Sequence, residues 1–170
     1  MNTGQENAGI DELLNAFSQK LILYQDANYA KSYRKIMDAI SAQFGDTIIS
    51  QKSAKALFRA MAIKDEYEVA RLMLSPTFEQ TLKSKFGNSR PSSYYLAPPF
   101  LSFLKDANGF PRKVRFGSWV RTIFWVLTKL KSLRGTAFDP FAHSRERKLE
   151  VSFRAALITK LSNPKKLMEM

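Results

Sequence analysis

Two carboxylates in one short charged segment are the first candidates for chemistry. Asp65 and Glu68 lie three residues apart between Lys64 and Arg71, a spacing that places them on one face of a helix. Paired carboxylates can act as a general acid and a general base. Lys64 and Glu68 are four residues apart and suit an ion pair worth about 0.3 kcal/mol when exposed. We therefore expect a solvated or interface-facing helix surface here, rather than an acid–base pair.

A Gly-Asp turn and a single histidine are the other candidates. Magnesium-bound diphosphates are often held by a turn such as Gly45-Asp46-Thr47, but no Asn pair follows it to supply further oxygen ligands. A helix end at Gly45 followed by a capping Asp46 explains the same residues. His143 has no second histidine in the chain to act with. We expect His143 to be partly exposed near the start of a helix.

The composition excludes several kinds of site. With no cysteine and one histidine among 170 residues, the chain cannot form a disulfide, a thiolate zinc site or a cysteine-ligated iron–sulfur cluster. The hydrophobic fraction of 45% and the charged fraction of 25% are ordinary for a globular protein. The composition therefore favours a binding or scaffolding domain over an autonomous enzyme.

Positive charge is concentrated in the second half of the chain. The formal net charge is +12, and residues 90–170 hold 16 Lys/Arg against 5 Asp/Glu, with no acidic residue from Ala107 to Phe138. Such asymmetry favours nucleic acid, anionic lipid, a phosphorylated cofactor or an acidic protein face as partner, although a plain solvated basic surface explains it equally well. The candidate contacts for an anion or a partner are Arg112, Lys113, Arg115, Arg121 and Arg134.

Aromatic and basic residues alternate between Trp119 and Arg134. A helix of this kind can lie on a membrane surface, or it can bury its apolar stripe while Lys and Arg tips reach solvent. We favour core packing, with Trp119 and Trp125 inside, because a domain of this size needs its aromatic residues in the core.

Apolar spacing predicts an all-α fold of five or six helices in a single domain. Stripes at helical spacing cover residues 10–24 and 29–44, as one helix or two, and a third helix is expected from about Ser50 to Leu74. Ser75-Pro76 begins a short helix that ends at Gly87. Further helices are expected from Trp119 and from Ser144, the last one facing inward through Leu149, Phe153, Ala156, Leu157 and Leu161.

The middle and the ends of the chain differ from these helices. Pro98-Pro99 prevents a regular helix, and Asp106 to Gly109 has turn chemistry, so a loop or short β-hairpin is expected around residues 90–116. Residues 1–9 are expected to be a disordered lead-in, residues 10–163 the helical domain, and residues 164–170 a tail. The sequence contains neither a signal-peptide pattern nor an apolar stretch long enough to span a bilayer, which predicts a cytoplasmic location.

Six segments in a fixed order carry a family resemblance. In combination they closely resemble the C-terminal domain of unknown function of the long bacterial indolepyruvate ferredoxin oxidoreductases, over about residues 12–158. The segments are Tyr24–Ala30, Lys64–Leu72, Leu96–Pro99, Phe116–Trp119, Leu133–Phe141 and Glu146–Arg147.

The resemblance implies a role within a larger enzyme. In that family the whole polypeptide decarboxylates aryl 2-oxoacids, mainly indolepyruvate, oxidatively to acyl-CoA and passes electrons to ferredoxin. Thiamine diphosphate and iron–sulfur clusters are expected only in its other domains, so no cofactor and no catalytic residue is assigned to this chain. The resemblance implies an accessory, non-catalytic domain that docks on the catalytic domains, with ferredoxin or CoA as further candidate partners.

The alternative is a stand-alone basic module that binds nucleic acid. We do not favour it, because the sequence contains no helix-turn-helix spacing, no zinc finger and no aromatic RNA-binding strand motif.

Overall fold

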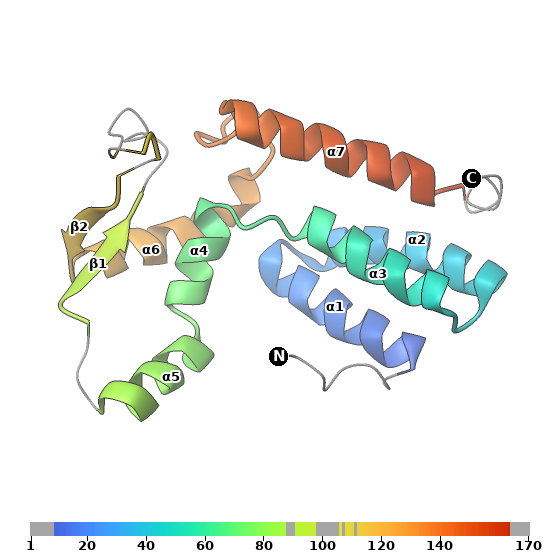
Figure 1. Cartoon of the computed structure of the whole chain (residues 1–170), viewed down its shortest axis with the longest axis horizontal. Helices are drawn as coiled ribbons and strands as arrows, with labels where there is room; N and C mark the ends of the chain where they lie inside the picture. The colour runs from blue at the N-terminus through green and yellow to red at the C-terminus, as the bar shows by residue number, and fades with distance from the viewer. Residues whose placement is uncertain (1–8, 88–90, 98–105, 107, 111, 164–170) are drawn as a thin grey trace. The chain divides into compact units, whose positions relative to one another are not determined.

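Capping and turn residues divide the chain into short helices (Figure 1). The structure is a computed structural model that describes residues 9–87, 91–97, 106, 108–110 and 112–163. Its elements are α1 (Ile10–Tyr24), α2 (Ala27–Phe44), α3 (Ile48–Met61), α4 (Glu66–Met73), α5 (Pro76–Phe86), β1 (Ser93–Leu96), β2 (Val114–Gly117), α6 (Val120–Lys129), a 3-10 helix (Leu130–Leu133) and α7 (Arg145–Leu161). The predicted all-α class with a short β excursion is confirmed, with seven α-helices in the described residues instead of five or six.

Side-chain caps explain the additional helix. The Asp65 carboxylate accepts a hydrogen bond from the Glu68 N–H at 2.8 Å and starts α4 there. The expected continuous helix from Ser50 to Leu74 was therefore wrong, because the cap begins a new helix after a short break. Asp26 caps α2 in the same way and separates it from α1, and Ser75 caps α5 with Pro76 in its first turn, as predicted.

The helices form two compact units. Unit 1 contains α1, α2, α3 and α7, and unit 2 contains α4, α5, β1, β2, α6 and the 3-10 helix. The single domain expected over residues 10–163 stays a prediction. The expected lead-in and tail lie outside the described residues, apart from Gly9.

Unit 1 is built around a continuous apolar core. Leu14, Tyr33 and Leu57 are fully buried, and the Tyr33 hydroxyl donates to the Ala54 carbonyl at 3.3 Å. From α7 only the last turns join this core, through Leu157, Ile158 and Leu161. The expectation that Leu149, Phe153 and Ala156 face inward was wrong: all three are exposed, Leu149 at 61% and Phe153 at 65%.

The α2–α3 turn follows the predicted chemistry only in part. Gly45 ends α2 with a positive φ of 64°, which favours glycine. Thr47, not Asp46, caps α3 by accepting from the Ser50 N–H. The two Asp46 carboxylate oxygens instead accept hydrogen bonds from the Ile10 N–H and from the Gln51 amide.

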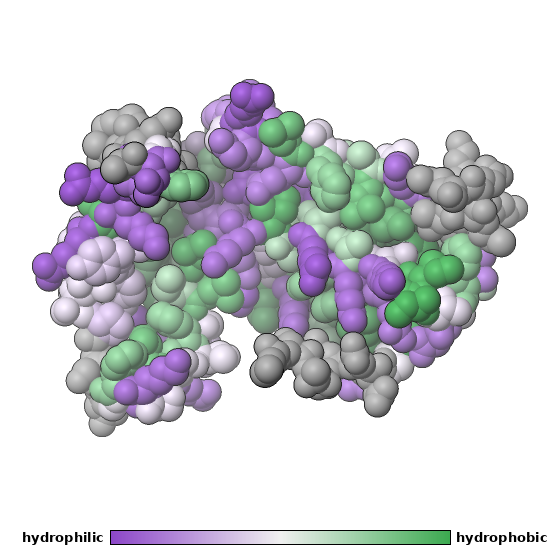
Figure 2. All heavy atoms as spheres, viewed as in Figure 1, coloured by the Kyte–Doolittle hydropathy of each residue, from purple (hydrophilic) through white to green (hydrophobic). Residues whose placement is uncertain are grey.

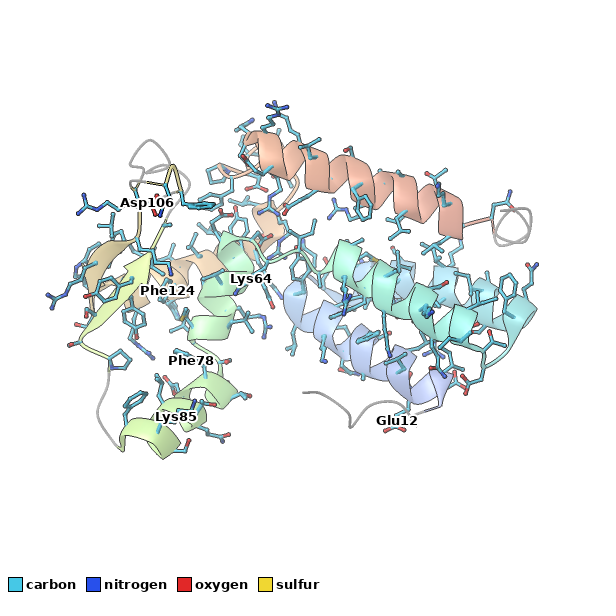
Figure 3. All side chains as sticks on the ribbon, viewed as in Figure 1. Glu12, Lys64, Phe78, Lys85, Asp106 and Phe124 are labelled. Atoms are coloured by element: carbon cyan, nitrogen blue, oxygen red, sulfur yellow. The ribbon has the colours of Figure 1, made fainter. Side chains whose placement is uncertain are left out.

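Unit 2 contains the predicted excursion as a two-stranded antiparallel ribbon. Tyr94 pairs with Phe116 on its inner face, and Tyr95 pairs with Arg115 on its outer face. Tyr94 meets Phe124 of α6 edge to face, with the two ring centres 5.6 Å apart. Phe124 is labelled in Figure 3. The expected turn near Asp106 is present, because its carboxylate accepts from the Asn108 and Phe110 N–H groups, whereas Pro98-Pro99 lies outside the described residues.

Candidate functional site

The five predicted basic contacts divide into two groups. Arg112, Lys113 and Arg115 are exposed at the start of β2, where Figure 2 shows a hydrophilic surface. Among the described residues, no carboxylate forms an ion pair with any of these three. Arg121 and Arg134 are both held in ion pairs within unit 2. Three of the five candidates therefore present their charge to solvent.

Arg121 connects three elements of unit 2. Its Nη2 lies 2.6 Å from Glu79 Oε1 on α5, and its Nη1 lies 3.4 Å from the Tyr94 hydroxyl on β1. The hydrogen bonds with Tyr94 and Glu79 raise the pKa of Arg121 above its ordinary value. Arg121 thus positions α6 against α5 and the ribbon.

Arg134 is largely buried against an aspartate. Its Nε and Nη2 bind the two carboxylate oxygens of Asp65 at 2.5 and 2.9 Å, and the two side chains are only 10% and 2% exposed. The guanidinium also lies 5.4 Å from the centre of the Tyr67 ring. A bidentate, stacked geometry of this kind requires Arg specifically. This charge is compensated inside unit 2.

A second buried aspartate completes the same network. The Tyr67 hydroxyl donates to Asp139 Oδ1 at 3.1 Å, and the Asp139 oxygens also accept from the Gly135 and Phe141 N–H groups at 2.9 and 3.0 Å. Burial raises the pKa of Tyr67 above its ordinary value, and the Asp139 carboxylate adds to that rise. We call Asp65, Tyr67, Arg134 and Asp139 the buried polar network.

This geometry gives the charged segment a structural role. Asp65 both caps α4 and binds Arg134, while Glu68 binds Arg71 at 2.7 and 2.8 Å. The expected solvated helix surface was wrong for Asp65, which is buried, and the expected Lys64–Glu68 pair is replaced by Arg71–Glu68. An acid–base role is not favoured, because the Asp65 carboxylate already accepts hydrogen bonds from the α4 cap and from Arg134.

Sequence reasoning missed Tyr67 and Asp139 as a pair. The available signal was that they lie in two of the segments that carry the family resemblance, Lys64–Leu72 and Leu133–Phe141. Residues 72 positions apart show no mutual spacing pattern, so only the folded chain brings them together. His143, in contrast, is exposed as expected.

The tryptophans of α6 are not in the core. Trp119 and Trp125 are 59% and 58% exposed, whereas Val120 and Phe124 of the same helix are buried. The expectation of buried tryptophans was wrong, because unit 2 covers only the side of α6 that carries Val120 and Phe124. Trp119, which lies at the start of α6 directly after β2, makes this end of the helix a second candidate for partner contact.

The described residues show neither a metal-binding cluster nor a membrane-spanning helix. They contain no group of three or more His, Cys, Asp or Glu side chains arranged to hold a metal ion. Their helices include none with the length and apolar character needed to cross a bilayer.

Comparison with known proteins supplies a family. No curated protein and no solved structure matches the chain. Residues 10–160 match the model of a family of unknown function, DUF6537. This match spans α1 to α7 almost completely and includes the buried polar network and the exposed cations of β2. The chain therefore belongs to the DUF6537 family.

Proposed function

We propose that this protein is an accessory, non-catalytic module of an indolepyruvate ferredoxin oxidoreductase. Its six ordered segments resemble the C-terminal domain of those enzymes, which supports the assignment to that larger reaction. The observation that supports the non-catalytic role is that polar side chains of these segments bind one another inside the fold. The module docks on the catalytic domains, and the whole assembly converts aryl 2-oxoacids to acyl-CoA and reduces ferredoxin.

Residues of these segments stabilise the fold through contacts with one another. Asp65 and Arg134, from two different segments, bind each other, and Tyr67 and Asp139 from the same two segments do likewise. In unit 1, the Tyr29 hydroxyl donates to the Met61 carbonyl at 3.0 Å and accepts from Arg154 at 3.2 Å. Polar groups that already hold these partners specify how the segments pack and are poorly placed to exchange protons with a substrate.

The cofactors of the proposed reaction do not fit the residues of this chain. A cysteine-ligated cluster has no ligand here, because the sequence contains no cysteine. The candidate diphosphate turn is also occupied, since the two Asp46 oxygens bind the Ile10 N–H at 3.2 Å and Gln51 at 3.0 Å. Under the proposal, thiamine diphosphate and the clusters belong to the catalytic domains.

The exposed cations supply the contact chemistry of the module. Arg112, Lys113 and Arg115 suit an acidic face of a partner, with ferredoxin or the phosphates of CoA as candidates. Arg121 and Arg134 do not belong to this contact, because each is engaged in an ion pair within unit 2. Binding that depends on such charges weakens as ionic strength rises.

Reconstitution tests this function. The chain is mixed with an indolepyruvate ferredoxin oxidoreductase from which the corresponding domain has been deleted, and binding is measured by calorimetry. We expect a complex, and we expect no conversion of indolepyruvate by the chain alone. Turnover by the isolated chain would contradict the non-catalytic assignment, and failure to bind the truncated enzyme would contradict the assignment to this reaction.

Nucleic-acid binding is the second candidate, favoured by the same three exposed cations. If it is correct, a gel-shift titration at low salt gives binding whose log affinity falls with log salt, with a slope of about −0.9 per phosphate contact on duplex DNA. A titration without any shift removes this candidate.

A further inference from the structure

One side of α6 carries an exposed apolar stripe that unit 2 does not use. Trp119 begins it, and Ile123, Val126 and Leu130 follow at spacings of four, three and four residues, which places them along one side of the helix. Their exposed fractions lie between 40% and 59%. The other apolar side, with Val120 and Phe124, is buried against α4 and the ribbon.

This stripe continues onto the outer face of the ribbon. A Cβ atom at Gly117 would lie 3.0 Å from Cδ1 of Trp119, so the indole ring lies close against β2 at that position. Side chains alternate along a strand, and Arg115 therefore shares the outer face with Gly117. Its cross-strand partner is Tyr95, which is 63% exposed. Trp119, which also meets the Phe116 ring edge to face with ring centres 5.9 Å apart, thus lies where the apolar stripe of α6 reaches the end of β2.

We infer that these residues form one docking surface for a protein partner whose contact face has an apolar centre rimmed by carboxylates. The inference rests on the proposed function and assigns that contact face to the catalytic part of the oxidoreductase. We call the surface the α6 docking surface. Its members are Tyr95, Arg115, Trp119, Ile123, Val126 and Leu130.

Charge and residue type both favour such a partner. Trp, Tyr and Arg are the residue types that dominate binding energy at protein interfaces, and one of each lies exposed here. None of the ion pairs of the described residues involves Arg115 or the neighbouring Lys113 and Arg112, so these exposed side chains present a positive rim. A partner rimmed by carboxylates matches that rim and is steered toward it.

The aliphatic residues of the stripe favour a protein partner over nucleic acid or a membrane surface. Single-stranded nucleic acid stacks its bases on aromatic rings, and Ile123, Val126 and Leu130 offer no ring for that contact. Membrane-surface helices present a wide apolar face, whereas this stripe is a single row along the ten residues of α6. A flat apolar protein surface can bury these side chains as they stand.

Variants on opposite sides of α6 test the inference. The tested changes are Trp119→Ala and the double change Ile123→Ser with Val126→Ser. Trp125→Ala is the matched control, because Trp125 has the same exposure but projects from another side of the helix. Binding to the truncated oxidoreductase lacking this domain is measured for each, and circular dichroism checks that each variant is folded.

We expect Trp119→Ala to weaken the complex about thirtyfold, as for a central anchor residue, and the double change to weaken it at least tenfold. Trp125→Ala should leave binding within twofold. Arg115→Glu should weaken binding at low salt and lose most of that effect at high salt, whereas Lys85→Glu on α5 should do neither (Figure 3).

The outcomes separate this inference from the proposed function. If the unaltered chain binds and the stripe variants bind equally well, the docking surface is overturned and the accessory role stands. If the unaltered chain does not bind, the proposed function fails and the inference fails with it. Binding of an oligothymidylate, or of phosphatidylserine-containing vesicles, that is lost in Trp119→Ala would overturn the protein partner.

Discussion

Each of the two units of this protein is stabilised by a different kind of interaction. In unit 1, α1, α2 and α3 share a core of fully buried apolar residues such as Leu14, Leu21 and Leu57. In unit 2, the described buried apolar cluster is limited to Ala70, Tyr94, Val120 and Phe124. Alongside that small cluster lies the buried polar network. Where little apolar surface is available for burial, specific polar contacts determine how the elements pack.

This difference explains where the family segments lie. Most of them fall in unit 2, and two of them supply all four residues of the buried polar network. Apolar core positions accept several residue types of similar volume. A bidentate Arg134–Asp65 pair with Tyr67 beneath it does not, because each partner depends on the exact hydrogen-bonding pattern of the other. Two of the segments that carry the resemblance therefore also specify the packing of unit 2.

Removing Asp65 should have the largest effect on stability. Asp65→Ala leaves the buried Arg134 guanidinium without this carboxylate and also deletes the α4 cap, so we expect a loss of about 3–5 kcal/mol. Hydrogen exchange should rise mainly in α4 and α6. The matched control is Asp38→Ala, whose exposed ion pair with Arg34 is worth below about 1 kcal/mol. Equal losses in the two variants would contradict the proposed role of the network.

A cavity in the other unit should have a comparable but slightly smaller effect. Leu57 is fully buried in unit 1, and Leu57→Ala should lower the free energy of unfolding by about 3 kcal/mol through lost burial and the cavity that remains. Denaturant unfolding measures the loss, and exchange should rise mainly in α1, α2 and α3. Ile48→Ala, at a 63% exposed position of α3, is the control and should change stability little. A loss confined to unit 2 amides would contradict the division.

Alkaline pH should produce the smallest effect, and it should act on both units. Burial raises the pKa of Tyr33 in unit 1 and of Tyr67 in unit 2 above the ordinary value of 10.0. In the unfolded chain these groups lose their protons near pH 10, while the folded chain keeps them. The unfolded state then binds fewer protons, so the free energy of unfolding falls as the pH rises above about 10.

Two substitutions sharpen that pH dependence. Tyr33→Phe and Tyr67→Phe should each flatten the fall in stability above pH about 10, at a cost near neutral pH of about 1 kcal/mol for the lost hydrogen bond. Tyr95→Phe is the control, because the Tyr95 side chain is 63% exposed. Urea unfolding at several pH values measures the slopes. Unchanged slopes in both variants would show that other groups control alkaline unfolding.

Local signals predicted most of the helices. Ser75-Pro76 begins α5 and Gly45 ends α2, as expected, because capping depends on residues only a few positions apart. The split between α3 and α4 was missed for the opposite reason. Asp65 stands in a segment without Gly or Pro, and its burial depends on Arg134, which is 69 positions away.

Of the five predicted contact residues, the sequence correctly identified as free surface charges only those that no distant carboxylate pairs with in the fold. Arg112, Lys113 and Arg115 are exposed, and their stretch contains no acid that could compensate them. Arg121 and Arg134 lie in the same stretch, but Glu79 and Asp65 compensate them from elsewhere in unit 2. Net charge is additive along a sequence, whereas ion pairing depends on which side chains meet.

The sequence by itself determined the helical class, the cysteine-free chemistry and the excess of positive charge. These properties follow from composition and from spacing within a turn or two of helix. Only the tertiary structure decided which arginines are neutralised, which side of α6 is covered, and that Tyr67 meets Asp139. Those outcomes depend on contacts between segments that are distant in the sequence, and such contacts form only when the chain folds.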